Sequence, residues 1–211
     1  MPASAPEYIE RIIRTTPTAE LMTREEKIAC MTATSIEIGC VEGDDDLEQI
    51  LVLQKRNLTF SKDGFVTVHH TLDILRAFHA MMPSVVARHH GDVVGYALSM
   101  PREASGLVPI LEPMFRRLDT LAVLAAQRWY VMGQVCVDEA WRGRGLFGKL
   151  YDEHRNRFAG QFDWLVTEIA MRNPRSLKAH ARVGFVEIDR YVDDTDEWSV
   201  VGLRLSRSER T

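Results

Sequence analysis

A glycine-rich stretch between a strand-like and a helix-like segment constrains this chain more than any other feature. Residues 142–148 read RGRGLFG; an alternating apolar segment, 129–137, precedes them, and a helical pattern covers 146–158. The three glycines keep side chains away from the backbone, so successive N–H groups can converge on one anion. The helix that follows adds free amides and the positive end of its dipole. The sequence therefore predicts a phosphate-binding loop at a helix N-terminus.

Two other interpretations of this loop stay open. Gly143, Gly145 and Gly148 formally satisfy the dinucleotide pattern G-x-G-x-x-G, but neither an early first strand nor a well-placed ribose-binding acid accompanies them, and the pattern alone is weak. The loop could also be a tight turn with solvated arginines at 142 and 144. The helix behind it is expected to face the core through one stripe of side chains, made by Phe147, Leu150, Tyr151, His154 and Phe158.

Strand and helix patterns alternate from residue 129 onward. Strands are expected at 129–137, 162–170, 185–192 and 198–205, and helices at 146–158 and 174–183. A strand–helix–strand unit of this length is typical of a right-handed crossover between two parallel strands.

The first half of the chain contains shorter segments. The sequence predicts strands at 36–38, 84–89 and 93–100, and helices at 45–58 and 71–81. It also predicts a turn at 90–92 and an insertion at 101–128 with a helical stretch to about 126. We expect a helical N-terminal extension over 1–34, with a short helix at 23–31, then one domain over 35–205 and a polar tail at 206–211.

A second constellation lies at residues 173–185, NPRSLKAHARVGF. Asn173 suits a helix N-cap, the following proline suits the first helical position, and Gly184 suits the position after the helix end. Asn173, Ser176 and His180 are three and four residues apart, so they share one helix face. Leu177, with Ala181 or Val183, is expected to face the core.

Composition excludes several classes of function. The net charge of −4 among 211 residues and the absence of long basic runs argue against a nucleic-acid partner. The longest fully apolar run, 121–126, is too short to cross a bilayer, and the first residues lack a signal-peptide pattern. Three cysteines at irregular spacing offer neither a disulfide framework nor a metal site. We expect a reduced, cytoplasmic protein with no membrane partner and no metal.

Both motifs resemble those of the GNAT superfamily of N-acetyltransferases. Arg142-x-x-Gly145-x-Phe147 is similar to its acetyl-CoA signature, with Phe147 in place of the usual small residue. The segment 173–185 is similar to its Asn-x-x-[Ala/Ser]-x-x-x-Tyr-x-x-x-Gly-Phe motif, with His180 where the family often has a tyrosine that protonates the departing CoA thiolate.

This resemblance implies an α/β fold with a mixed, mostly antiparallel central sheet flanked by helices, and a parallel strand pair, 129–137 and 162–170, around the CoA site. Acetyl-CoA or another short acyl-CoA is the implied co-substrate, and the implied acceptor is a small-molecule or peptide amine. The implied CoA-binding residues are Val135, Cys136, Val137, Arg142, Gly143, Arg144, Gly145, Leu146, Phe147, Gly148, Asn173 and Ser176. For Cys136 we prefer a small core residue to any covalent role.

Two residues are candidates for proton transfer. Glu168 lies in an otherwise apolar strand, where a carboxylate is costly unless it is paired or functional. It is a candidate base for the acceptor amine, and a structural partner for backbone or arginine groups is the alternative. His180 is a candidate acid for the departing thiolate, because an imidazole titrates near neutral pH. A CoA contact without proton transfer and a structural role are its alternatives.

Several questions stay open at this level. Tyr191 and the acidic residues at 193–197 could bind a cationic acceptor, but an acidic turn between strands is the simpler interpretation. The apolar insertion at 107–126 could form a wall of the acceptor pocket or a homodimer contact. A catalytically silent module that binds acyl-CoA as a sensor or scaffold is the competing function.

Overall fold

The computed structural model describes residues 35–59 and 68–205. The chain divides into two units, Met1–Ile36 and Glu37–Thr211. The first unit lies almost entirely outside the described residues, as do the expected N-terminal helices and the C-terminal tail. The fold described below is therefore that of the second unit.

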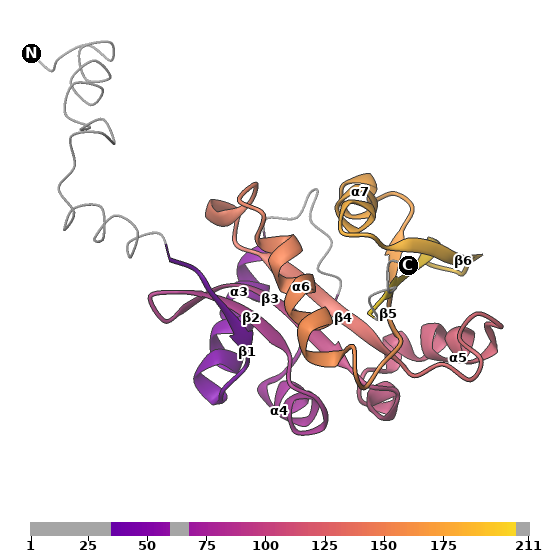
Figure 1. Cartoon of the computed structure of the whole chain (residues 1–211), viewed down its shortest axis with the longest axis horizontal. Coiled ribbons are helices and arrows are strands. Elements are labelled where there is room, and N and C mark those ends of the chain that lie inside the picture. Colours follow the sequence, from indigo (N-terminus) through magenta and orange to yellow (C-terminus); the bar gives the residue numbers. More distant parts are fainter. Residues whose placement is uncertain (1–34, 60–67, 206–211) are drawn as a thin grey trace, which may run out of the picture. The chain divides into compact units, whose positions relative to one another are not determined.

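The second unit is built on a seven-stranded sheet with the order β1-β2-β3-β4-β5-β7-β6 (Figure 1). Neighbouring strands are antiparallel except for β4 and β5, which are parallel. The predicted mixed, mostly antiparallel sheet is confirmed. The strands are β1 (Glu37–Cys40), β2 (Val85–His89), β3 (Asp92–Met100), β4 (Trp129–Val137), β5 (Trp164–Ala170), β6 (Val186–Val192) and β7 (Glu197–Arg204).

Helices cover both faces of this sheet. They are α3 (Asp44–Thr59), α4 (Leu72–Met81), α5 (Glu112–Thr120), α6 (Leu146–Phe158) and α7 (Pro174–Arg182), with short 3-10 turns η1 (Arg102–Leu107), η2 (Pro109–Leu111) and η3 (Glu139–Trp141). Successive residues of a strand point to opposite faces. Val131 packs in the core that α3, α4 and α5 share, whereas the Tyr130 ring contacts His154 and Phe158 of α6 on the other face.

The parallel strands β4 and β5 diverge after a short stretch of pairing. Their ladder runs only from Trp129–Trp164 to Val131–Val166. On its other edge, β4 carries one extra residue at Gly133, because Leu98 pairs with Gln134 while Ser99 pairs with Met132. Such a bulge bends a strand. Beyond Val131, the β5-facing edge of β4 therefore has no strand partner within the described part of the chain.

The insertion departs from its predicted structure. The helix α5 ends at Thr120 instead of continuing to about residue 126, and Leu121 is already extended. Residues 122–126 form a turn, with Ala126 at a positive φ of 59°. The apolar run suits a helix locally, but Leu124 is buried in the core that the insertion shares with the sheet. Tertiary packing decides this segment over local propensity.

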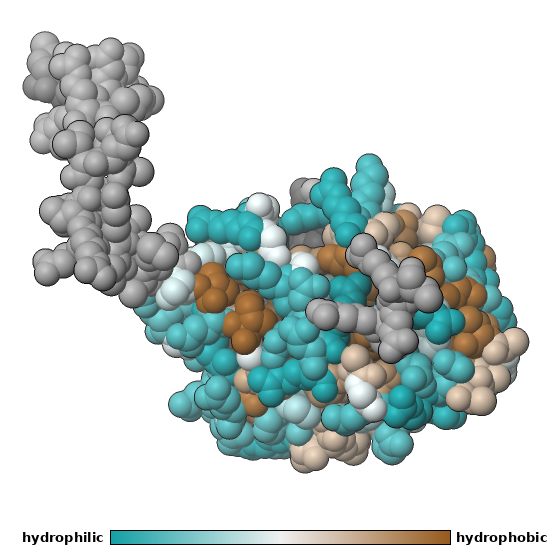
Figure 2. All heavy atoms as spheres, viewed as in Figure 1, coloured by the Kyte–Doolittle hydropathy of each residue, from teal (hydrophilic) through white to brown (hydrophobic). Residues whose placement is uncertain are grey.

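The surface in view is mainly hydrophilic, with separate apolar patches (Figure 2). Large exposed hydrophobic side chains come from several elements, including Val52 of α3, Met81 of α4 and Val192 of β6. In the two described stretches, no helix has the length and apolar character needed to cross a membrane.

Candidate functional site

An open groove of about 960 Å³ separates the glycine-rich loop from α7. Residues of both sequence motifs and the end of β4 line it. Those expected from the sequence are Val135, Cys136, Val137, Arg142, Gly143, Gly145, Leu146, Phe147, Gly148, Asn173 and Ser176. Arg144, Glu168 and His180 are not among its lining residues.

The glycines of the loop have the geometry that the phosphate-binding prediction requires. Gly143 and Gly145 have φ angles of 75° and 77°, a region that side-chain-bearing residues rarely adopt. A Cβ at either position would meet nothing within 4 Å, so the backbone faces open space. At Gly148 a Cβ would lie 3.7 Å from the Val183 side chain, an ordinary van der Waals contact, so α6 and the end of α7 pack closely at this point.

The two loop arginines have local partners. The Arg142 guanidinium donates to the Val137 carbonyl at 3.1 Å and to Oδ1 of Asn57 at 2.6 Å, which braces the loop against β4 and α3. Arg144 lies over the Trp141 ring, 4.7 Å from its centroid. These contacts explain why Arg144 is absent from the groove lining.

The groove takes positive charge mainly from α7, which sequence reasoning missed. Arg175, Lys178 and Arg182 line it, and their spacing of three and four residues places them on one helix face. That spacing is visible in the sequence and could have identified them. Asn57 of α3 also lines the groove, but its distance along the chain gives no such signal.

The end of β4 offers backbone groups to this groove. Val135 and Val137 pair with β3 on one edge, while the other edge lies beyond the β4–β5 ladder. The Cys136 side chain is only 7% exposed, and burial raises the pKa of its thiol to about 11. At neutral pH the thiol is protonated, as suits a small core residue.

His180 is held between α6 and α7, with 3% of its surface exposed. Its Nδ1 lies 2.9 Å from the Ser176 carbonyl oxygen and 3.2 Å from the Ser176 hydroxyl. Because the nearer carbonyl oxygen can only accept, we assign the hydrogen to Nδ1. Nε2 then accepts from the Tyr151 hydroxyl at 2.8 Å. Burial lowers the pKa of His180 to about 4, so the imidazole is neutral at physiological pH.

Phe147 lies over this buried histidine instead of in the core. Its ring centroid is 5.0 Å from those of Tyr151 and His180, in edge-to-face geometry. Leu146 is buried in the core, as are four members of the predicted stripe, Leu150, Tyr151, His154 and Phe158, whereas Phe147 is only partly buried. On α7, the expected core position Ala181 is exposed, and His180 is buried instead.

Glu168 lies on β5, two residues past its last pairing with β4. The Tyr191 hydroxyl donates to its Oε2 at 2.5 Å. Burial raises the pKa of Glu168 to about 7; the Tyr191 hydrogen bond opposes this rise, and the nearby Asp193 charge adds to it. The carboxyl group therefore changes its protonation state close to neutral pH.

In the acidic turn after β6, carboxylate groups accept hydrogen bonds from the turn itself and pair with a nearby arginine. Asp193 Oδ1 accepts from the backbone N–H and the hydroxyl of Thr195, at 2.8 and 2.6 Å, and from the Asp196 N–H at 3.0 Å. Asp196 pairs with Arg172. These contacts favour the interpretation of 193–197 as a structural turn over a cation-binding site.

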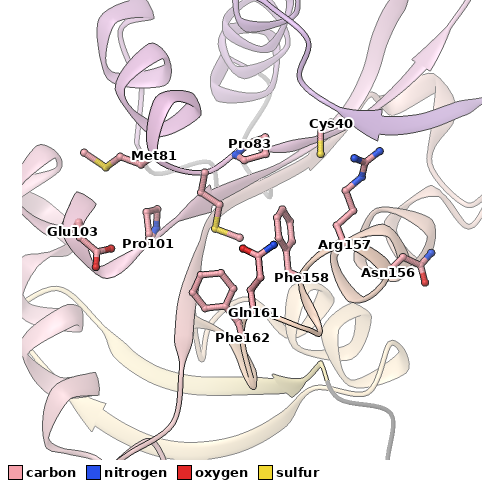
Figure 3. A pocket seen from close by; sticks show the side chains of 11 residues that line it. Cys40, Met81, Pro83, Pro101, Glu103, Asn156, Arg157, Phe158, Gln161 and Phe162 are labelled. Atoms are coloured by element: carbon pink, nitrogen blue, oxygen red, sulfur yellow. The ribbon is translucent and has the colours of Figure 1, made fainter.

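A second cavity, of about 830 Å³, contains none of the predicted site residues. Figure 3 shows Cys40 of β1 and Arg157 of α6 at one side of it, and Met81 of α4 with Glu103 at the other. Across residues 35–59 and 68–205, no group of three or more His, Cys, Asp or Glu side chains is arranged to hold a metal ion.

Comparison with known families gives a match over most of this unit. The model of the acetyltransferase (GNAT) family matches residues 47–185. No curated protein matches the chain.

Solved structures of low sequence identity share the fold. An N-acetyltransferase from Staphylococcus aureus Mu50 superposes with a TM-score of 0.57 at 19% identity, covering 82% of this chain and 100% of that chain. YncA from Salmonella typhimurium, solved with its cofactor acetyl-CoA, gives 0.59 at 18%, covering 82% and 96%. The ribosomal-protein-S18-alanine N-acetyltransferase from Escherichia coli gives 0.57 at 12%, covering 83% and 97%.

Proposed function

This chain belongs to the GNAT family of acetyltransferases, and we propose that it transfers an acetyl or other short acyl group from acyl-CoA to a primary amine. The observation that carries the proposal is the groove of about 960 Å³, where both motifs meet although they are distant in sequence. A loop of glycines at the start of α6 forms one wall, and the cationic face of α7 forms the other.

The residues of the groove fit an acyl-CoA. The open space beside Gly143 and Gly145 leaves backbone N–H groups accessible at the positive end of α6, which suits a pyrophosphate. Arg175, Lys178 and Arg182 offset the phosphate charge. The free edge of β4 at 135–137 suits a pantetheine arm, which carries amide groups. When bound there, acyl-CoA supplies a thioester as the acyl donor.

We assign Glu168 as the base for the acceptor amine. An amine must lose a proton to become an amide, and a carboxylate with a pKa of about 7 can accept it at neutral pH. Tyr191 occupies Oε2, so the proton goes to Oε1. The position of Glu168 beyond the β4–β5 ladder supports this role, because the two strands have separated there.

For His180 we adopt the structural role among the three left open by the sequence. Its Nδ1–H donates a hydrogen bond to the Ser176 carbonyl oxygen, and its Nε2 accepts one from the Tyr151 hydroxyl. A neutral imidazole with both nitrogens occupied is poorly placed to protonate a thiolate in the groove. The departing thiolate then takes its proton from solvent in the open groove.

We further propose that the insertion forms a wall beside the acceptor. Arg117 of α5 makes two hydrogen bonds to Asp189 of β6, at 2.6 and 3.0 Å. This pair holds α5 against the strand that carries Tyr191. The acceptor class is a small-molecule or peptide amine.

A silent acyl-CoA sensor is the second candidate, and one observation favours it. Phe147 replaces the small residue of the signature and covers a buried histidine at the position where the family often has tyrosine. In this function the same groove binds acyl-CoA, but no acyl group leaves it.

Thiol release from acetyl-CoA tests the proposed function against the sensor. The purified chain would be incubated with polyamines, amino acids, aminoglycosides and peptides with free N-termini, and CoA thiol would be followed by a colorimetric reagent. Acetylation of an amine above the rate without protein is expected. Binding of acetyl-CoA with no release in the presence of any amine would assign the sensor function instead.

A further inference from the structure

Tyr191 contacts the proposed base although neither motif includes it. The strand β7 lies between β5 and β6 in the sheet. Glu168 pairs with Val200 of β7, and Tyr191 pairs with Trp198 two residues away. Adjacent strands are about 4.8 Å apart, so the two backbones are separated by two such spacings. Only two long side chains on the same face of the sheet can meet across β7.

The contact between them is short and charge-assisted. The Tyr191 hydroxyl donates to Oε2 of Glu168 at 2.5 Å, within the range typical of O–H···O⁻ bonds. Burial raises the pKa of Tyr191 far above its ordinary value, so the hydroxyl keeps its proton and remains a donor. Among the described residues, none donates a hydrogen bond to Oε1 of Glu168.

An ion pair with α5, in the insertion, holds the strand β6 that carries Tyr191. Asp189, two residues before Tyr191, receives both hydrogen bonds from Arg117 of α5. This pairing lowers the pKa of Asp189, which stays ionised. The pair lies beside an irregularity in β6, where the register shifts between Glu187 and Asp189. Tyr191 therefore projects from a strand held by both β7 and α5.

We propose that Tyr191 is the positioning residue of this active site: its hydroxyl holds one oxygen of Glu168 and leaves the other oriented to receive the proton of the acceptor amine. This inference rests on the proposed function. It gives the insertion a role, because α5 holds the strand from which Tyr191 acts.

Two neighbouring groups of Glu168 should shift its pKa in opposite directions. Tyr191 and Asp193 act on Glu168 from β6 and the turn that follows, while Arg117, which is paired with Asp189, acts on Tyr191. A hydrogen bond to the charged form lowers a carboxyl pKa, and a nearby negative charge raises it. Removing the Tyr191 hydroxyl should therefore raise the pKa of Glu168, and removing the Asp193 charge should lower it.

The decisive measurement is the titration of Glu168 itself, which needs no knowledge of the acceptor. Carbon-13 NMR of side-chain-labelled glutamate would follow each carboxyl, and the signal lost in Glu168→Gln would assign this one. Tyr191→Phe should raise the titration midpoint by about one to two pH units, as loss of a charged hydrogen bond implies. Asp193→Asn keeps the turn-forming oxygen and should lower the midpoint by a smaller amount.

Activity gives the second readout. With the best amine from the acceptor panel, the acidic limb of the kcat/KM profile should move to higher pH in Tyr191→Phe and to lower pH in Asp193→Asn. The kcat/KM of Tyr191→Phe should approach the wild-type value at high pH. A folded Tyr191→Phe protein with an unchanged Glu168 titration would overturn the positioning role. If that variant does not fold, the Cζ carbon-13 signals of the tyrosines in the wild-type protein serve instead: the absence of any tyrosine signal that shifts as Glu168 titrates, and that stops shifting in Glu168→Gln, would overturn it. A shifted titration with no amine acetylation by the wild-type chain overturns the proposed function, while the hydrogen bond stands.

Discussion

At the scale of single residues, His180 explains how the two walls of the groove are joined. It lies on α7, and its partner Tyr151 lies on α6; both side chains are almost fully buried. Phe147 covers the pair from the groove side through edge-to-face contacts. The three residues form one packed unit, so a change in His180 should first affect stability.

Replacing His180 by phenylalanine should destabilise the fold. The substitution removes the acceptor for the Tyr151 hydroxyl, and an unsatisfied buried hydroxyl costs about 1–3 kcal/mol. Adding Tyr151→Phe removes the orphaned hydroxyl and should restore part of that loss. Urea unfolding of both single variants and the double variant measures this coupling. Full stability together with a hundredfold loss of kcat would instead restore His180 as the acid.

Glu168→Gln should abolish most of the activity while leaving the groove intact. A positioned general base typically contributes about 10²–10⁴-fold to the rate, and glutamine cannot accept the proton. CoA affinity should be unchanged, because Glu168 does not line the groove. Glu103→Gln, at the second cavity, is the matched control and should keep full activity. Equal activity in both variants would remove Glu168 from the mechanism.

Some residues of the candidate site were predictable from the sequence and others were not, for physical reasons. Glu168 is visible because a lone carboxylate in an apolar strand is costly wherever the strand packs. Tyr191 is not visible as its partner, because their contact spans two strand spacings and depends on the irregular register of β6. Phe147 was expected in the core because its spacing from Leu150 and Tyr151 fits a core-facing stripe, but its ring packs on His180 of α7, a contact between two helices that leaves no local sequence pattern.

At the scale of elements, the loop before α6 carries the strongest constraint. Its sequence alone predicted β4 and α6 with the bounds that the structure has, because glycine at positive φ and the helix pattern act locally. The end of α5 was not predictable in the same way. There the burial of Leu124 overrides a run of good helix formers.

Gly145→Ala should weaken CoA binding. Gly145 is the N-cap of α6 at φ 77°, and a left-handed backbone costs a residue with a side chain about 1–2 kcal/mol. The added methyl group also enters the space beside the phosphate loop. We expect about a tenfold or greater loss of CoA affinity in equilibrium binding. Gly160→Ala, with no atom within 4 Å of the new Cβ and no positive φ, is the control. Equal weakening in both variants would contradict the role of the loop.

At the scale of the whole molecule, the mixed sheet with flanking helices was expected from the family resemblance, and the local patterns predicted the order of strands and helices along the chain. The spatial order of the strands was not predicted, since β7 lies between β5 and β6 although it follows both in the sequence. The divergence of β4 and β5 could not be predicted from the sequence. It depends on the extra residue at Gly133, where a Cβ would lie 2.2 Å from the Met100 sulfur. Close packing between side chains of two neighbouring strands that are separated by a long insertion in the sequence leaves no local pattern.

The buried histidines predict how stability depends on pH. Burial lowers the pKa of His70 and His180 to about 4 and that of His154 to about 3. Each group binds its proton more readily in the unfolded chain, so the free energy of unfolding falls as the pH drops from about 6.5 toward 4. Glu168 acts in the opposite direction between about pH 7 and 4.5, because its pKa is raised. Because three histidines act against one glutamate, we expect the free energy of unfolding to fall with decreasing pH in this range.

Thermal unfolding between pH 7.5 and 4.5 checks this expectation. The melting temperature should fall steadily below pH 6.5. His154→Gln lowers the starting stability but should make the dependence shallower, since one of the three titrating groups is gone. A melting temperature that is constant over this range would show that the histidines are not buried as described.

The central claim is that the groove between the glycine loop and α7 holds acyl-CoA, and isothermal titration calorimetry with acetyl-CoA tests it most directly. We predict saturable binding at one site per chain in the wild-type protein. Neutralising the α7 face by Arg175→Gln, Lys178→Gln and Arg182→Gln should weaken that binding, and more so at low salt than at high salt. The absence of measurable heat with folded wild-type protein, or equal affinity in the neutralised variant, would contradict the account.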